Sequence, residues 1–303
     1  MRPMPAHPLH APVLGWYDAH ARDLPWRRPD CSPWGVFVSE VMSQQTPIVR
    51  VLPAWHAWLA RWPAPADLAA DAPGEAIRLW DRLGYPRRAL RLHAAAVAMV
   101  ERHGGQVPDD EEALRALPGV GAYTAAAVAA FAFGRRACVV DTNVRRVLAR
   151  TVTGAEYPAP ALTAAEHALA ASVVPDDAAT AARWAVASME LGALVCTARS
   201  PRCGDCPVLA RCAWQQAGAP AHDGPPRRGQ AYAGTDRFVR GLLLAQLRAT
   251  DGPLPHDVLV DRVPDSALRD PLQRDRCLDG LVADGLVDVV DDGVYALPGA
   301  ARG

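Results

Sequence analysis

The sequence predicts a mainly α-helical protein that ends in a small α/β module. Helix formers, alanine above all, dominate the 303 residues, and half of all residues are apolar, which is enough for a sizeable buried core. Short turns rich in Pro and Gly separate the helical segments. The alternating apolar pattern that is typical of strands is scarce until the C-terminal end.

The helices are expected one after another along most of the chain. We place them at residues 8–22, 34–52, 54–61, 65–70, 73–83, 87–103, 110–116, 122–133, 141–152, 162–173 and 178–195. Residues 217–235 have the composition of a linker. Three more helices (238–248, 255–262 and 270–284) then precede two alternating runs (286–290 and 294–297) around Asp291-Asp292-Gly293, an order that resembles a winged helix.

The composition argues against a membrane span and against secretion. No apolar run of about 18 uncharged residues occurs, and Met1-Arg2-Pro3-Met4 lacks the apolar core of a signal peptide. The formal net charge is only −1, and residues 221–303 are more acidic than the rest. Since the chain contains no lysine, every fixed side-chain cation is an arginine, whose planar fork suits phosphate.

Four cysteines form the strongest motif, a C-x6-C-x2-C-x5-C run of Cys196, Cys203, Cys206 and Cys212. Four thiolates in so short a loop can close around one metal centre. Structural zinc sites usually split into two C-x2-C knuckles across a longer gap, so the three unequal gaps favour one 4Fe–4S cluster over zinc. Disulfides fit poorly because nothing marks an oxidising compartment.

The segment Leu117-Pro118-Gly119-Val120-Gly121 joins two predicted helices. Two glycines permit backbone angles that other residues avoid, so the turn can direct N–H groups outward at the start of a helix, as in an anion-binding nest. Such a hairpin would grip a phosphodiester without reading bases. An ordinary tight turn between helices is the alternative.

Two carboxylates are candidates for acid–base and electrostatic roles. Asp141 follows the apolar run Val139-Val140 and opens a helix, so it is either an N-cap or a buried anion near the hairpin. Glu40 interrupts an apolar helix, where burial would raise its pKa and suit a general acid near neutral pH. A surface glutamate beside solvated Gln44 and Gln45 is the alternative for Glu40.

The hairpin, the downstream Asp141 and the cysteine loop occur in the same order in the helix-hairpin-helix DNA glycosylases of the endonuclease III superfamily, which the chain resembles. Further segments look like those of MutY-type adenine DNA glycosylases, and the resemblance covers roughly residues 8–215. These segments are Arg22-Asp23-Leu24-Pro25-Trp26, Ser39-Glu40-Val41-Met42, Gln44-Gln45-Thr46, Leu83-Gly84-Tyr85 and Glu190-Leu191-Gly192-Ala193.

The resemblance implies a two-lobed fold, a six-helix barrel plus a 4Fe–4S helical domain, with the winged-helix-like α/β module behind it. We expect the cluster domain at residues 1–30 and 138–216, and the barrel with its helix-hairpin-helix at 31–137. The linker then occupies residues 217–235 and the C-terminal module residues 236–303.

The resemblance also implies a role for each matching residue. Glu40 would protonate adenine N7, Asp141 would stabilise the oxocarbenium-like sugar, and Tyr123 and Asn143 would assist. Arg22, Trp26, Ser43 and Glu190 would line the pocket for the flipped adenine, since the glycosidic bond is out of reach within the stack. The DNA contacts would come from Gln44, Gln45, Thr46, Leu83, Tyr85, Gly119, Val120, Gly121, Arg199 and Arg202.

Lyase members of the superfamily carry a lysine where this chain has Tyr123, so the resemblance implies a monofunctional enzyme that leaves an abasic site. The expected substrate is double-stranded DNA with adenine opposite 8-oxoguanine. The expected state is a monomer in the bacterial cytoplasm, on the nucleoid when bound to DNA, with a protein partner for the C-terminal module.

Two departures from the family pattern keep alternatives open. Ser43 replaces the usual Leu, so the target base can differ, and the C-terminal module is too short for the family's Nudix-like partner domain. A non-catalytic lesion-binding protein is the alternative from a different functional class.

Overall fold

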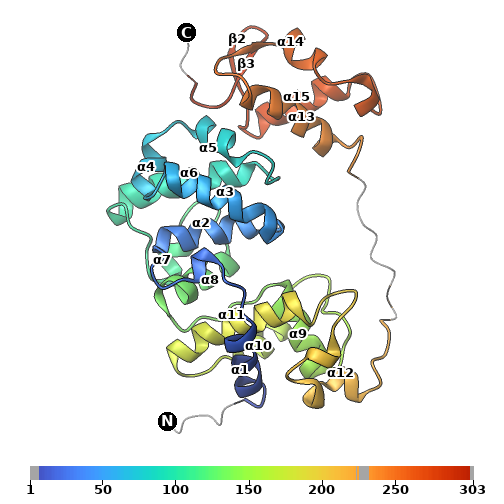
Figure 1. Cartoon of the computed structure of the whole chain (residues 1–303). Coiled ribbons are helices and arrows are strands. Elements are labelled where there is room, and N and C mark those ends of the chain that lie inside the picture. Colours follow the sequence, from blue (N-terminus) through green and yellow to red (C-terminus); the bar gives the residue numbers. More distant parts are fainter. Residues whose placement is uncertain (1–6, 223, 225–231, 301–303) are drawn as a thin grey trace. The chain divides into compact units, whose positions relative to one another are not determined.

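The computed structural model describes residues 7–222, 224 and 232–300, and it confirms a mainly helical fold with a small C-terminal sheet (Figure 1). None of the helices in these residues is long and apolar enough to cross a bilayer. The helices are α1 (His10–His20), α2 (Pro33–Ser43), α3 (Ile48–Arg61), α4 (Pro65–Ala70), α5 (Pro73–Trp80), α6 (Arg87–His103), α7 (Glu111–Arg115), α8 (Ala122–Phe133), α9 (Thr142–Leu148), α10 (Ala164–Ser172), α11 (Ala178–Leu194), α12 (Ala213–Gln216), α13 (Asp236–Arg248), α14 (His256–Asp261) and α15 (Gln273–Ala283).

The chain divides into two compact units. Unit one comprises residues 1–37, 108–116 and 120–226, and unit two comprises residues 38–107, 117–119 and 227–303. The predicted boundaries of the cluster domain and the barrel remain a proposal. The predicted linker 217–235 lies partly outside the described residues.

Unit one is built around α9 and α11, which pack on α1 and α10 through an apolar core that includes Val147, Trp184 and Leu191. Alanines on α8 and α11 form a second core, where small side chains let the two helices approach closely. Polar caps fix where the helices begin: Asp141 accepts from Val144 N–H and Asp177 accepts from Thr180 N–H.

The helix predicted at 34–52 is wrong, because the structure ends α2 at Ser43 and begins α3 at Ile48. Pro47 adopts an extended conformation before α3, which a proline imposes more easily at a helix start than within a helix. Pro53, where we place a break, lies inside α3. Val49, in the first turn of α3, is largely exposed.

In unit two, α3 to α6 enclose a core of three tryptophans whose rings meet edge to face, Trp58, Trp62 and Trp80. All three are buried. Aromatic pairs in this geometry add to the stabilisation that comes from burial alone. Trp80 also donates from Nε1 to the carbonyl of Gly84 at 2.9 Å, so this core supports the turn at residues 81–86.

The C-terminal module (residues 232–300 as described) has the order α13, β1 (Leu254–Pro255), α14, α15, β2 (Asp288–Asp291) and β3 (Val294–Ala296). The three strands form an antiparallel sheet in the order β1-β3-β2. The winged-helix-like arrangement is therefore confirmed, and β1 is an addition that the sequence analysis missed. Its two residues are too few to show an alternating pattern.

Candidate active site and metal centre

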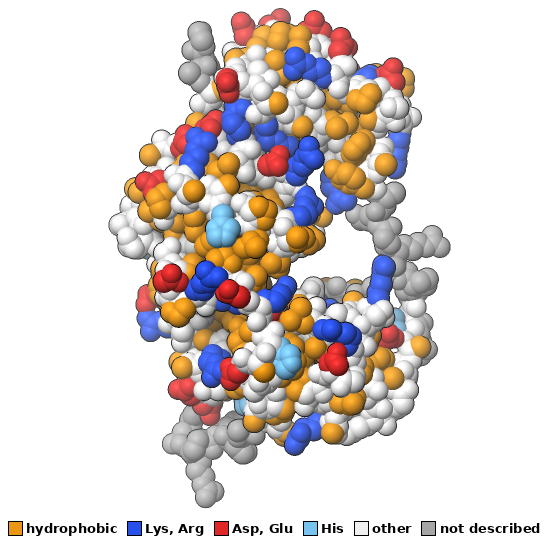
Figure 2. All heavy atoms as spheres, viewed as in Figure 1, with side chains coloured by type: hydrophobic (Ala, Val, Ile, Leu, Met, Phe, Trp, Pro, Cys, Tyr) orange, Lys and Arg blue, Asp and Glu red, His pale blue; other side chains and the backbone are white. Residues whose placement is uncertain are grey.

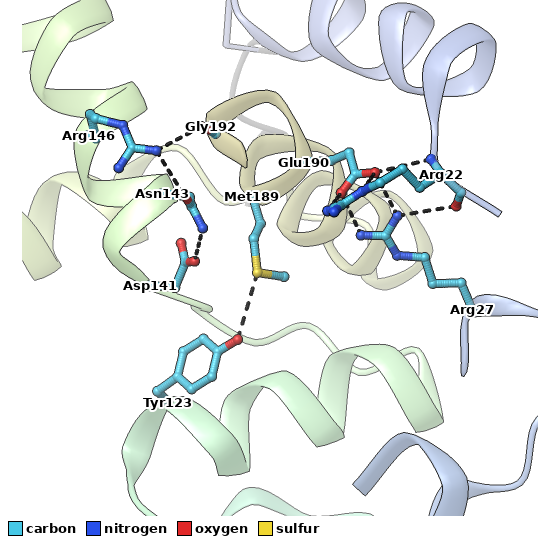
Figure 3. Close-up of polar contacts among 9 residues, drawn as sticks. All are labelled: Arg22, Arg27, Tyr123, Asp141, Asn143, Arg146, Met189, Glu190 and Gly192. Atoms are coloured by element: carbon cyan, nitrogen blue, oxygen red, sulfur yellow. Dashed lines mark hydrogen bonds and ion pairs between the residues drawn. The ribbon is translucent and has the colours of Figure 1, made fainter. Parts of the chain in front are cut away.

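Asp141 lies at the N-terminus of α9 with its carboxylate held on both oxygens (Figure 3). Oδ1 accepts from the backbone N–H of Val144 at 2.7 Å, and Oδ2 accepts from Asn143 Nδ2 at 2.6 Å. Burial raises the pKa of Asp141, and these two hydrogen bonds oppose the rise. The N-cap alternative for Asp141 is therefore confirmed, and its side chain is partly buried.

Arg146 connects the Asp141 site to the cysteine loop. Its Nη2 donates to Asn143 Oδ1 and to the carbonyl of Gly192, each at 2.7 Å, and its Nε donates to the carbonyl of Cys196 at 2.6 Å. A Cβ on Gly192 would lie 2.6 Å from Asn143 Cβ, so only glycine lets α11 approach this closely. Arg146, five residues after Asp141, is not among the site residues predicted from the sequence.

Glu190 on α11 is completely buried and binds two arginines (Figure 3). Arg22 donates to it through Nε at 2.8 Å and Nη2 at 2.6 Å, and Arg27 donates through Nη1 at 3.0 Å and Nη2 at 2.8 Å. Burial alone would raise the pKa of Glu190, but the hydrogen bonds and charges of the two arginines hold it at about 2. Glu190 is therefore a fixed anion.

The sequence analysis paired Glu190 with Arg22 and Trp26 but missed Arg27, the residue that follows Trp26. Trp26 itself is buried in a 3₁₀ turn, Pro25–Arg27. Tyr123 enters the same region from the first turn of α8, and its hydroxyl donates to Met189 Sδ at 3.7 Å (Figure 3). Unit one thus gathers Asp141, Asn143, Tyr123 and Glu190 from three helices.

Glu40 and Ser43 lie on α2. Glu40 is 8% exposed, so the structure confirms the predicted burial of this carboxyl and rules out a surface glutamate. Ser43 is half-buried at the C-terminal end of α2. Glu40 belongs to unit two and Asp141 to unit one.

Two turns of unit two, which we call the insertion loops (residues 44–46 and 83–85), hold the predicted DNA contacts. Gln45 and Tyr85 have positive φ angles of 54° and 48°, which non-glycine residues adopt only when surrounding contacts enforce them. Both side chains are exposed, Tyr85 by 45%. Thr46 and Leu83 are buried instead, so their side chains shape the loops and do not reach the surface.

Arg88 on α6, which the sequence analysis missed, ties the two insertion loops together. Its Nη1 donates to the carbonyl of Gln44 at 2.7 Å, and its Nη2 donates to Thr46 Oγ1 and the carbonyl of Gly84, each at 2.9 Å. Nη1 also donates to two carbonyls at the end of α2, those of Val41 and Met42. Burial lowers the pKa of Arg88 to about 10, so it stays charged at neutral pH.

The predicted hairpin turn is present, but only one of its glycines uses a special backbone conformation. Gly119 has a φ of 77°, and a Cβ there would lie 2.6 Å from Arg91 Cβ. Gly121 is extended and is the N-cap of α8. Of the two glycines expected to permit such angles, only Gly119 therefore uses one. A phosphodiester contact by Gly119, Val120 and Gly121 stays a prediction.

The four cysteine thiols line one cavity of unit one, together with apolar side chains of α9 and α11. Within the described residues, no three His, Cys, Asp or Glu side chains stand close enough to hold a single metal ion. Zinc would require sulfurs about 2.3 Å from one point, whereas thiols spread around a cavity suit a larger cluster. Arg150 Nη1 donates to Cys196 Sγ at 3.4 Å and Gln215 Nε2 to Cys203 Sγ at 3.2 Å, contacts that favour negatively charged sulfur.

Arg199 and Arg202 lie in the loop between Cys196 and Cys203, and both are exposed. Arg202 Nη2 donates to the carbonyl of Leu194 at 2.8 Å and so satisfies the C-terminal end of α11. A phosphate contact by either arginine stays a prediction.

Comparison with known proteins identifies this arrangement. Residues 38–168 match the model of the HhH-GPD superfamily base excision DNA repair proteins, and residues 196–212 match the iron–sulfur binding domain of endonuclease III. The second match begins at Cys196 and ends at Cys212. It confirms the predicted cofactor, one 4Fe–4S cluster.

The chain is 53% identical over 297 residues to the adenine DNA glycosylase of Mycobacterium tuberculosis (strain ATCC 25618 / H37Rv), covering 97% of this chain and 95% of that protein. It is 42% identical over 213 residues to the adenine DNA glycosylase of Homo sapiens, covering 67% and 39%. A solved thermostable thymine-DNA glycosylase has a TM-score of 0.61 at 28% identity, covering 68% and 94%. The chain therefore belongs to the adenine DNA glycosylase family within the HhH-GPD superfamily.

Proposed function

We propose that the chain is a monofunctional DNA glycosylase that removes adenine paired with 8-oxoguanine. The observation that carries the proposal is the environment of Asp141, a partly buried carboxylate that Val144 N–H and Asn143 hold in place. A carboxylate with a fixed orientation is suited to stabilise positive charge that develops on a sugar. The family to which the chain belongs supports adenine as the base.

The proposed reaction divides between two carboxyl groups. Glu40 gives its proton to adenine N7, and the bond between adenine N9 and the sugar C1′ breaks with its electrons going to the base. Asp141 stays ionised and stabilises the sugar cation until water adds to C1′ and returns a proton to the Glu40 carboxylate. Glu40 is 8% exposed, and this burial keeps its carboxyl away from bulk water, which supports its assignment to the first step.

The absence of lysine supports the monofunctional part of the proposal. A lyase step needs an amine that forms a Schiff base with C1′, and no lysine occurs anywhere in the chain. Tyr123 stands instead at the first turn of α8. The product is then an intact strand with an abasic site.

We further propose that Gln45 and Tyr85 insert into the duplex beside the mispair while the hairpin at Gly119–Gly121 holds a phosphodiester. The exposure of Gln45 and Tyr85 at the tips of the insertion loops supports their role. Arg199 and Arg202 would add phosphate contacts, whose strength falls with salt. The proposed state on DNA is a monomer.

A single-turnover assay on duplexes that carry A, G, T, U or hypoxanthine opposite 8-oxoguanine or a normal base tests the substrate. We expect the fastest release for adenine opposite 8-oxoguanine, with strand breakage only after heat or alkali. Faster release of another base would instead support the alternative that Ser43 retunes the pocket. Binding without release of any base would support the non-catalytic alternative, and nicking without heat or alkali would contradict the monofunctional proposal.

A further inference from the structure

The C-terminal module is docked onto the rest of unit two by specific contacts. The N–H of Gly74 at the start of α5 donates to the carbonyl of Pro298 at 2.8 Å, and a Cβ on Gly74 would lie 2.6 Å from that oxygen. Arg78 of α5 donates to the carbonyl of Thr250 at 3.0 Å, and Arg87 of α6 pairs with Asp284 at 3.2 Å. This approach tolerates only glycine at position 74.

The docked module brings Arg237, in the first turn of α13, onto the exposed ring of Tyr85. Arg237 Nη1 donates to Tyr85 Oη at 3.1 Å, and its guanidinium carbon lies 5.7 Å from the centre of the Tyr85 ring. The same guanidinium lies 5.2 Å from the ring of Tyr232, which is also exposed. Arginine therefore lies against two exposed aromatic rings, the combination that favours cation–π contacts and base stacking.

Tyr85 is thus held by two arginines from two parts of the unit. The guanidinium of buried Arg88 lies 5.6 Å from the centre of the same ring. Arg88 fixes the backbone of the loop through Gly84, while Arg237 contacts the exposed part of the side chain. Since the positive φ of Tyr85 needs external support, both contacts favour one orientation of the ring.

The charge of Arg237 remains available to DNA. Within the described residues no carboxylate forms an ion pair with Arg237. By contrast, Arg240 of the same helix pairs with Asp284. Arg276 of α15 pairs with both Asp236 and Asp270. On the face that Figure 2 shows, arginine side chains gather where the module meets the rest of unit two, and acidic ones lie at the module's far end. Asp284, an acidic residue at the docked edge, is paired with both Arg87 and Arg240 and so does not offset the charge of Arg237.

We propose that the C-terminal module completes the DNA-insertion site, with Arg237 as the positioning residue that orients Tyr85 for entry into the duplex. The inference rests on the proposed function, in which Tyr85 inserts beside the mispair. In this role the C-terminal module contributes to DNA recognition by orienting Tyr85, and it does not need to contact the bases itself.

Insertion can be measured separately from base release. In the duplex, 8-oxoguanine is paired with 2′-fluoro-2′-deoxyadenosine, and 2-aminopurine is the neighbour of the 8-oxoguanine on the same strand. The fluorine disfavours the sugar cation and so blocks the release of adenine. Insertion unstacks the 2-aminopurine and raises its fluorescence. We expect Arg237→Ala to lower this rise, and the rate of adenine release from a normal substrate, by about threefold to tenfold, the range for one cation–π contact with a hydrogen bond.

Arg237→Lys should recover part of the loss, because a lysine keeps the charge but lacks the planar fork. Arg262→Ala is the matched control, since it removes an exposed arginine of the same module. Gly74→Ala tests docking by an independent route and should reproduce the loss. Gly15→Ala is its control, because nothing lies within 4 Å of the added Cβ.

The inference is overturned if wild type releases adenine but Arg237→Ala gives the same fluorescence rise as wild type and Arg262→Ala. If Gly74→Ala does not fold, the comparison of Arg237→Ala with Arg262→Ala decides alone. A wild type that releases no adenine at all would contradict the proposed function, and this outcome differs from a failure of the Arg237 variants.

Discussion

At the scale of single residues, the carboxyl groups of Glu190 and Asp141 in unit one have opposite pKa shifts because their neighbours differ. Glu190 accepts from two guanidinium groups, which lower its pKa to about 2. Asp141 accepts from one backbone N–H and one amide, which do not offset the burial that raises its pKa. Glu190 is therefore a permanent anion that holds Arg22 and Arg27 in place. The pKa of Asp141 is raised, so its ionisation depends more strongly on its surroundings.

Glu190→Gln is expected to destabilise the fold by about 3 kcal/mol, because it leaves two partly buried arginines without their counter-ion. Urea unfolding measures the change. Asp23→Asn is the control, since the pair of Asp23 with Arg28 is exposed to solvent and should contribute little to stability. Equal effects of the two substitutions would contradict a special role for the Glu190 cluster.

The contribution of Glu190 depends on pH with a definite sign. Its pKa is lower in the folded state than the ordinary value of 4.5, so the unfolded chain binds the proton more readily. The stabilisation is therefore fully present above about pH 4.5 and is lost as the pH falls towards 2. The difference in stability between wild type and Glu190→Gln should shrink over that window, whereas a difference that grows would contradict the assignment.

In Asn143→Ala, the fall in the single-turnover rate of adenine release at acidic pH is expected to begin at a higher pH than in wild type. We call this part of the pH profile the acid limb. The Asn143 amide stabilises the ionised form of Asp141, so its loss raises the pKa of Asp141 further and removes the active form sooner as pH falls. Thr142→Ala, at the exposed neighbouring position, is the control. If the acid limb of the pH profile is the same in Asn143→Ala and wild type, ionisation of Asp141 does not determine it.

At the scale of elements, the break between α2 and α3 is what creates the first insertion loop. The loop keeps Gln45 in its positive-φ conformation because Arg88 donates to the carbonyl of Gln44 on one side of it and to Oγ1 of Thr46 on the other. The second loop keeps Tyr85 in a similar conformation through the same arginine. Arg88 thus couples two turns that are distant in the sequence.

Arg88→Ala should destabilise unit two by about 3 kcal/mol, because several buried acceptors lose their donor at once. Hydrogen exchange should speed up at residues 44–46 and 83–85 more than in the α3–α6 core, and the affinity for duplex DNA should fall. Arg102→Ala, at the exposed end of the same helix, is the control. Unchanged exchange in both loops would contradict the coupling.

At the scale of the whole molecule, structures that depend on neighbouring residues, such as helices and the cysteine cluster, could be predicted from the sequence. Contacts between residues that are far apart in the sequence could not. The spacing of four cysteines gave the cluster, and Pro/Gly turns placed α6 and α8 at the observed residues. The roles of Arg27, Arg88 and Arg146 could not be predicted, because each donates hydrogen bonds to acceptors that are distant in the sequence. In a chain whose fixed cations are all arginines, no local pattern separates a buried arginine from a solvated one.

The C-terminal module shows the same limit. Its helices and wing follow from periodicity and one turn signal, but its docking depends on Gly74 and Pro298, which nothing in the sequence connects. The module lies within the region shared with the mycobacterial relative, whose match covers 97% of this chain, against 67% for the human one.

The central claim, that Glu40 is the acid for base release, is tested most directly by single-turnover kinetics of Glu40→Gln on a duplex with adenine opposite 8-oxoguanine. Gln keeps the size of the side chain but cannot deliver the proton. The proposed mechanism predicts that adenine release is abolished while the dissociation constant for the same duplex stays close to that of wild type. Adenine release at the wild-type rate, or a loss of DNA binding that accounts for the lost activity, would contradict it.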